Sequence, residues 1–209
     1  MGVRILNLSR QIIAMSGGGF SKEIPAYIDE YIIKQVQKVS KIKICFIPTA
    51  SNDAVGYIDK FHEAFSSYET THILQSEMAL KETKDRILKQ DIIYVGGGNT
   101  QFMLNKWRKY GFDELIRLAY QNGTLLTGIS AGAMCWFERC FSENESNEYE
   151  EFEGLGILKG TLCPHYDDEI RKSAFDQWIL DQENLTAYAL YDSETLHFRD
   201  ERIIAKLDT

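Results

Sequence analysis

A serine flanked by small residues is the first candidate for chemistry in this chain. Ser130 is the centre of the pattern Gly-Ile-Ser-Ala-Gly at residues 128–132, with an apolar run before it and a helix-like segment after it. This is the G-x-S-x-G arrangement of a nucleophile elbow, in which a sharp strand-to-helix turn exposes the serine hydroxyl. A serine that only caps a helix would suit the same position. The pattern alone leaves both interpretations open.

A serine nucleophile needs a base, and the chain has four histidines. His165 follows Pro164 in a loop after an apolar run, which is where a site at a sheet edge collects its side chains. Its imidazole could take the serine proton and return it to a leaving amine. His62, His72 and His197 lie within helix-like or strand-like runs. We therefore predict His165 as the general base.

A second glycine turn, "YVGGGNT", ends another apolar run. The carboxyl ends of parallel strands share one edge of a sheet, so this turn and Ser130 should open into the same crevice. Backbone amides of Gly97 or Gly98, together with that of Ala131, would then form an oxyanion hole.

Glycine turns before helices also bind phosphate, which is the alternative interpretation. Neither "SGGGF" nor "VGGGNT" has the spacing of a dinucleotide fingerprint, and neither carries the lysine of a P-loop. The four cysteines form no CxxC pair and lie mostly in apolar segments, as reduced core thiols do. These features argue against a nucleotide-binding turn.

The elements that must position these residues follow from the alternation of short apolar runs with helical patterns. Such alternation is typical of an α/β fold, a mainly parallel sheet with helices on both faces. Strands buried on both faces are apolar almost throughout. On this criterion the inner strands are predicted at residues 12–15, 44–47, 92–95 and 125–128.

The rest of the chain gives weaker signals. A helical pattern over residues 102–123 is interrupted at Gly111, where a helix should end. Residues 142–153 form a polar, acidic stretch. The closing runs at 185–192, 194–199 and 202–208 predict an antiparallel edge.

Composition and charge limit the possible functions. The 209 residues, 44% of them hydrophobic, fit a single domain over residues 1–209. A net charge of −8 without a basic stripe argues against nucleic-acid binding. No run approaches the roughly 20 apolar residues of a membrane span, and the start of the chain lacks a signal-peptide pattern. We expect a cytoplasmic protein, monomeric or homodimeric, without a membrane partner.

Three motifs together resemble the peptidase E family of serine peptidases, which includes aspartyl dipeptidases and has cyanophycinases as distant relatives. They are "GISAGAMCWF", "YVGGGNT" and "CPHYDDE", in matching order and spacing. The resemblance implies a flavodoxin-like sheet of the class I glutamine amidotransferase type, without metal or cofactor. It also implies that Ser130 is the nucleophile and His165 the base in hydrolysis of short peptides through an acyl-enzyme.

The third member of the relay departs from the family pattern. Peptidase E has an aspartate in the loop between elbow and histidine, whereas the corresponding segment here, "FSENESNEYEEFEG", has none. Glu145 occupies the matching position and Glu143 is the near alternative, so we predict a Ser-His-Glu relay. These glutamates could instead belong to a solvated acidic loop.

Specificity is a further expectation from the resemblance. Aspartyl dipeptidases recognise an N-terminal aspartate, which requires a cation, and Arg171 and Arg139 are the nearest basic candidates. Asn99, Thr100 and Tyr166, with Arg171, are predicted to contact the peptide. The neighbouring glutamates would repel an acidic side chain unless they face away, which leaves Asp-X specificity open.

Two other functions compete with the peptidase. An α/β-hydrolase esterase could use Ser130 with Asp192 and His197, although the HGGG-type oxyanion segment is missing and few elements follow the elbow. A non-catalytic module could use the glycine turns to bind a small anion or metabolite. In that module, replacement of Ser130 by alanine would leave ligand affinity intact.

Overall fold

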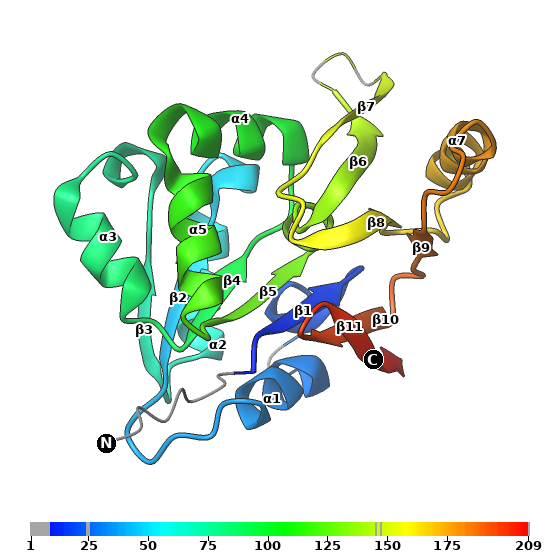
Figure 1. The fold of residues 1–209 in the computed structure, drawn as a ribbon. Helices are drawn as coiled ribbons and strands as arrows, with labels where there is room; N and C mark the ends of the chain where they lie inside the picture. Colours follow the sequence, from blue (N-terminus) through cyan, green and yellow to red (C-terminus); the bar gives the residue numbers. More distant parts are fainter. Residues whose placement is uncertain (1–8, 24–25, 145, 147, 209) are drawn as a thin grey trace, which may run out of the picture.

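Residues 9–23, 26–144, 146 and 148–208 are described by the structure, a computed structural model of the chain. A seven-stranded sheet forms its centre (Figure 1). The strand order is β11-β10-β1-β5-β4-β2-β3. The strands are β1 (Gln11–Met15), β2 (Lys43–Ile47), β3 (Glu69–His72), β4 (Ile92–Val95), β5 (Leu125–Ile129), β10 (Glu194–Arg199) and β11 (Arg202–Asp208).

The parallel part of this sheet confirms the predicted inner strands. β1, β5, β4 and β2 pair in parallel and lie between flanking strands on both sides. Alternate residues of β1 enter two different cores: Ile12 and Ala14 lie in one, Ile13 and Met15 in the other. Burial of both faces is the reason that these strands carry almost no polar residues.

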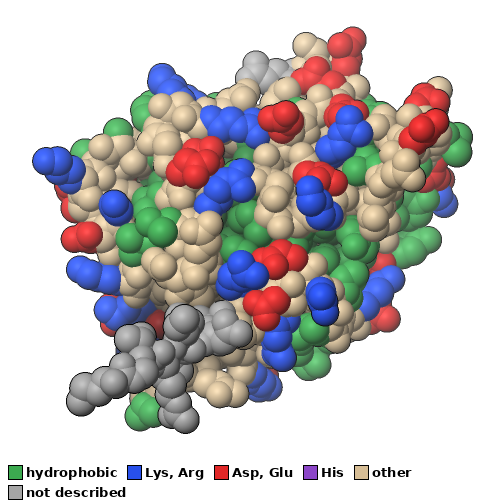
Figure 2. Space-filling model, viewed as in Figure 1, with side chains coloured by type: hydrophobic (Ala, Val, Ile, Leu, Met, Phe, Trp, Pro, Cys, Tyr) green, Lys and Arg blue, Asp and Glu red, His purple; other side chains and the backbone are tan. Residues whose placement is uncertain are grey.

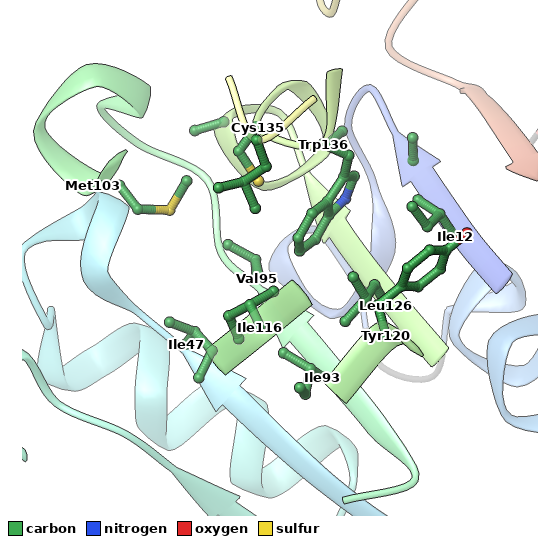
Figure 3. Packing of buried hydrophobic residues seen from close by; sticks show 14 of the residues in the cluster. Ile12, Ile47, Ile93, Val95, Met103, Ile116, Tyr120, Leu126, Cys135 and Trp136 are labelled. Atoms are coloured by element: carbon green, nitrogen blue, oxygen red, sulfur yellow. The ribbon is translucent and has the colours of Figure 1, made fainter. Parts of the chain in front are cut away.

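Helices cover both faces of the sheet. They are α1 (Tyr27–Lys34), α2 (Val55–Ala64), α3 (Lys81–Leu88), α4 (Thr100–Tyr110), α5 (Phe112–Gln121), α6 (Ala131–Met134) and α7 (Glu169–Leu180). One core contains Ile28 of α1 and Phe61 of α2. The other core includes Met103 of α4 and Ile116 of α5, packed with Val95 of β4 (Figure 3). This arrangement matches the predicted α/β fold.

The break between α4 and α5 lies at the predicted glycine. Gly111 has φ of 65°, in the left-handed region that a residue with a β-carbon adopts only with strain. Its amide closes the last turn of α4 by donating to the carbonyl of Arg108. The long helical pattern therefore becomes two helices.

A second, four-stranded sheet differs from the predicted arrangement. It has the order β7-β6-β8-β9 and consists of β6 (Phe137–Glu143), β7 (Tyr149–Glu153), β8 (Leu158–Cys163) and β9 (Ala187–Ala189). In Figure 1 the strands β6 and β7 lie between α4 and α7.

Two sequence predictions are wrong in this region. The acidic stretch contributes β7 and the end of β6, which pair antiparallel, and β7 carries half-buried Tyr149 and Phe152 among its glutamates. The run at 185–192 contributes β9, which pairs parallel to β8 instead of joining the antiparallel edge of the main sheet. Only β10 and β11 form that edge, as predicted.

Basic and acidic side chains are interspersed over the face shown in Figure 2. All four cysteines are buried and free of disulfides. Within the described ranges, no helix combines the length and apolar character needed to cross a membrane.

Candidate active site

Ser130 occupies a strained turn between β5 and α6. Its φ of 53° and ψ of −109° lie outside the regions favoured by residues with a β-carbon. The turn is held on both sides: the amide of Ser130 donates to the carbonyl of Met15 at 2.9 Å, and its carbonyl accepts from Ala133 at 2.9 Å. The side chain makes no capping hydrogen bond. A strained strand-to-helix turn is typical of a nucleophile elbow, and the helix-cap interpretation does not fit.

The glycines of the elbow are required by close backbone contacts. A β-carbon on Gly128 would lie 2.2 Å from the carbonyl oxygen of Gly132. A β-carbon on Gly132 would lie 2.3 Å from the carbonyl oxygen of Val95, in the neighbouring strand β4. Both separations are far below van der Waals contact, so only glycine fits at these two positions.

His165 lies beside the serine. Its Nε2 is 2.9 Å from Oγ of Ser130, within the range expected for a base and its nucleophile. The loop that carries His165 follows β8, and the residue itself has φ of 55°. Its backbone amide donates to the hydroxyl of Ser16 at 2.7 Å, which fixes the loop against the end of β1.

Asp192 contacts the other ring nitrogen of His165. Its Oδ1 lies against Nδ1 of the imidazole, while its Oδ2 accepts from Nζ of Lys22 at 2.7 Å. The amide of Gly17 donates to the carbonyl of Asp192 at 3.1 Å. Partial burial acts to raise the pKa of Asp192, but the hydrogen bonds from Lys22 and His165 outweigh it and hold the pKa below its ordinary value. Asp192 is therefore a carboxylate at neutral pH.

Glu143, the alternative glutamate predicted for the relay, does not contact His165. Both carboxylate oxygens of Glu143 are engaged elsewhere: Oε1 accepts from the Tyr149 hydroxyl at 2.7 Å, and Oε2 accepts from Arg171 at 3.2 Å. Glu143 lies opposite Tyr149 in the pairing of β6 with β7, and Arg171 lies in the first turn of α7. Glu145 lies outside the described residues.

The parallel pairing of β8 and β9 explains why Asp192 reaches His165. Cys163 of β8 is opposite Ala189 of β9, so the residues that follow each strand meet at the same end. The amide of Leu190 donates to the carbonyl of Cys163 at 3.0 Å and continues this pairing towards Asp192. From the sequence, Asp192 was considered only with His197, in the esterase alternative.

His197 does not form the esterase arrangement. It lies on β10 and is fully buried, with Nδ1 2.8 Å from the Tyr31 hydroxyl and Nε2 3.0 Å from Oε1 of Gln11. Burial, and secondarily Arg199, lower its pKa to about 4. His197 is thus a neutral core residue, and Asp192 contacts His165 instead.

The glycine turn after β4 lies beside the elbow, as the shared sheet edge predicted. A β-carbon on Gly97 would lie 3.5 Å from Cβ of Ser130. The Gly97 amide donates to the hydroxyl of Tyr57 at 3.4 Å. Gly98 has φ of 139° and packs so closely on Ala50 that a β-carbon would lie 2.1 Å from its carbonyl oxygen.

A polar pocket of about 240 Å³ adjoins Ser130. Its walls include Asn99 and Thr100 at the start of α4, Glu143 at the end of β6, and Arg171. The Arg171 side chain is only 14% exposed, whereas that of Glu143 is 43% exposed, so the cation lies deeper than the carboxylate. Three of the four predicted peptide contacts, Asn99, Thr100 and Arg171, are therefore at the pocket.

Tyr166, the fourth predicted contact, and Arg139, the other candidate cation, lie elsewhere. The Tyr166 hydroxyl donates to Asp176 at 2.6 Å. Arg139 pairs with Glu151 at 2.6 Å and donates to Gln182 at 2.7 Å. Neither side chain lines the pocket beside Ser130. Within the described part of the chain, no cluster of three or more His, Cys, Asp or Glu side chains could hold a metal ion.

The chain is similar to known peptidases over most of its length. The model of peptidase family S51 matches residues 12–206. The Bacillus subtilis strain 168 protein named "Uncharacterized peptidase YgaJ" is 39% identical over 198 residues, which cover 93% of this chain and 85% of that protein. Peptidase E of Actinobacillus pleuropneumoniae serotype 5b is 25% identical over 179 residues, covering 77% of this chain and 73% of that enzyme.

A solved structure shows that the fold is shared as well. The crystal structure of a peptidase from an acI-B1 Actinobacterium superposes with a TM-score of 0.78 and 16% identity, covering 99% of this chain and 91% of that one. The architecture is thus the flavodoxin-like α/β fold of the class I glutamine amidotransferase type. Because the family model spans nearly all of the described residues, the chain belongs to peptidase family S51 and is a relative of the peptidase E enzymes.

Proposed function

We propose that this serine peptidase hydrolyses short peptides with Ser130 as nucleophile, His165 as general base and Asp192 as the carboxylate that orients the base. The observation that carries the proposal is the position of His165, whose two ring nitrogens contact Ser130 and Asp192. A nucleophile joined to a base, and the base to an orienting group, is the arrangement that activates a serine hydroxyl.

Acylation follows from these contacts. The Ser130 hydroxyl passes its proton to Nε2 of His165 while Oγ attacks the peptide carbonyl carbon. Nε2 then gives the proton to the departing amine, the C–N bond breaks, and an ester on Ser130 remains. A water molecule repeats the sequence on the ester and releases the acid. Asp192 accepts the Nδ1–H bond throughout and stabilises the imidazolium that forms twice per cycle.

Two backbone amides are the donors that we propose for the oxyanion. Ala131 follows the nucleophile directly, as in other elbows, and Gly98 lies in the turn beside Ser130. Gly97 was predicted as an alternative to Gly98. Its amide already donates to the Tyr57 hydroxyl, so we assign the hole to Gly98 and Ala131.

The small pocket beside Ser130 supports short substrates. Ligand pockets commonly range from about 300 to 1,000 Å³, whereas this one holds about 240 Å³. It can take one side chain of a peptide but not an extended segment. We propose a dipeptidase-like activity in the cytoplasm, where four unpaired thiols would stay reduced.

Hydrolysis of a dipeptide panel tests the proposal. The purified protein should release free amino acids, and Ser130→Ala and His165→Ala should each abolish this release without unfolding the protein. His62→Ala is the matched control, because His62 hydrogen-bonds to Thr70 and His72 in a different part of the molecule. Turnover that persists in Ser130→Ala would overturn the nucleophile, and no turnover in wild type would favour the non-catalytic module.

A further inference from the structure

The pocket beside Ser130 contains a prebuilt ion pair. Glu143 and Arg171 are the two charged side chains among the described residues that line it, and their charged groups lie 3.2 Å apart. The pair joins the end of β6 to the first turn of α7. Its formal charges cancel, so the wall that a substrate side chain meets is polar but neutral overall.

Tyr149 fixes this pair in place. Its hydroxyl donates to Oε1 of Glu143 at 2.7 Å, and the Arg171 guanidinium lies 5.7 Å from the centre of its ring. Burial, and then the hydrogen bond to Glu143, raise the pKa of Tyr149 to about 12, so the phenol remains a donor at neutral pH. Glu143 is thereby held as an acceptor and Arg171 as a donor on the same wall.

An acidic substrate side chain suits this wall poorly. It could accept hydrogen bonds from Arg171, but it would bring a second negative charge next to Glu143. Like charges in contact disfavour binding, and Glu143 already offsets the charge that would attract an acid. An alkyl side chain would leave both polar groups without a new partner in a confined space.

An amide side chain satisfies both groups at once. Its carbonyl oxygen accepts and its NH2 group donates, whereas guanidinium only donates and carboxylate only accepts. Arg171 has five N–H groups, so it can bind the amide oxygen and keep its bond to Glu143. Oε2 of Glu143 can accept from the amide NH2 at the same time.

We propose that Glu143 and Arg171 together select peptides whose first residue, the one that supplies the attacked carbonyl, carries an amide side chain, asparagine or glutamine. This specificity rests on the proposed function, because the pocket is defined by its position beside the nucleophile. It assigns to Glu143 a role in substrate choice in place of the relay role predicted from the sequence.

The test compares kcat/KM for Asn-Leu, Gln-Leu, Asp-Leu and Ala-Leu. Wild type should prefer the two amide substrates over Asp-Leu by about tenfold or more, the size expected for one well-placed charge or hydrogen bond. Glu143→Gln keeps the shape and the contact with Tyr149 but removes the negative charge. It should raise the ratio of Asp-Leu to Asn-Leu hydrolysis by about tenfold or more.

Two further variants complete the comparison. Arg171→Gln leaves Glu143 as the unpaired charge and should lower amide hydrolysis while admitting Lys-Leu. Glu151→Gln is the matched control, because Glu151 also pairs with an arginine, Arg139, but does not line the pocket. It should leave all the ratios unchanged.

The outcomes separate this inference from the proposed function. If wild type cleaves dipeptides but prefers Asp-Leu, or if Glu143→Gln leaves the ratios unchanged, the specificity is wrong while the catalytic proposal stands. If Glu143→Gln slows all dipeptides equally, Glu143 binds the common α-ammonium group, and the specificity is again wrong. If Ser130→Ala cleaves as well as wild type, the proposed function and the specificity fall together.

Discussion

The backbone amide of His165 and the hydroxyl of Ser16 are joined by a hydrogen bond of 2.7 Å. Ser16 is fully buried at the end of β1, and its hydroxyl donates in turn to the carbonyl of Leu190 at 3.0 Å. The Ser16 hydroxyl therefore connects the loop that carries His165 with the segment that leads to Asp192. His165 has a positive φ, so its strained loop depends on such an anchor.

Ser16→Ala should reduce catalysis more than binding. The change leaves the His165 amide and the Leu190 carbonyl without their partner, which should cost about 1–3 kcal/mol of the free energy of unfolding. Displacement of the imidazole should lower kcat by about tenfold to a hundredfold with little change in KM. Steady-state kinetics and denaturant unfolding measure the two effects. A fall in stability with unchanged kcat would show that Ser16 supports only the fold.

Asp192→Asn should abolish most of the turnover while the fold persists. An amide cannot stabilise the imidazolium as a carboxylate does, and it can hold the ring in the wrong tautomer, so a loss of kcat of about 10⁴-fold is expected. Glu143→Gln is the comparison, because it should change specificity and not the relay. Near-normal kcat in Asp192→Asn would mean that Ser130 and His165 act as a dyad.

The difference between Ser130 and Asp192 shows which parts of the site could be predicted. Ser130, its glycines and His165 stand in local patterns, with an apolar strand before each loop. The inner strands and the break at Gly111 are also encoded locally, in runs of apolar residues and a residue that tolerates positive φ. Such features depend on short stretches of chain, so sequence reasoning identified them.

The contacts of Asp192 and Glu143 depend instead on segments that lie far apart in the sequence. β9 is three residues long, and nothing in its sequence distinguishes a parallel partner of β8 from an antiparallel edge strand. The strand β7 was likewise hard to predict, because glutamates dominate its composition. Glu145 and Glu143 were predicted for the relay from their position in the loop that carries the aspartate of peptidase E, a criterion that does not include the pairing of β9 with β8.

The elbow glycines give a prediction about stability. Gly128→Ala would place a β-carbon 2.2 Å from the carbonyl oxygen of Gly132, and both atoms belong to the packed backbone. A loss of about 3 kcal/mol or more in the free energy of unfolding is expected. Gly56→Ala is the control: Gly56 lies exposed in α2, a β-carbon added there would have no atom within 4 Å, and alanine should stabilise by about 0.5–1 kcal/mol. Equal effects of the two changes would contradict the packing argument.

Two buried titratable groups predict opposite dependences of stability on pH. Burial raises the pKa of Asp29 from 3.8 to about 7, despite a hydrogen bond of 3.0 Å from the Tyr94 hydroxyl. Between these values the unfolded chain releases a proton that the folded chain keeps, so the free energy of unfolding falls as pH rises. Burial lowers the pKa of His197 from 6.5 to about 4. Between these values only the unfolded chain binds the proton, so stability falls as pH falls.

The two contributions nearly cancel in the wild type between about pH 4 and 7, and single replacements should separate them. Asn in place of Asp29 can still accept from Tyr94 but cannot ionise. Relative to wild type, Asp29→Asn should gain stability as the pH rises from about 4 to 7, by on the order of 3 kcal/mol. His197→Gln removes the opposing group, so relative to wild type it should lose stability over the same rise in pH. Urea unfolding at a series of pH values measures both slopes. Parallel curves for wild type and Asp29→Asn would show that Asp29 is ionised in the folded protein, and that its buried carboxylate has a partner that offsets the cost of burial.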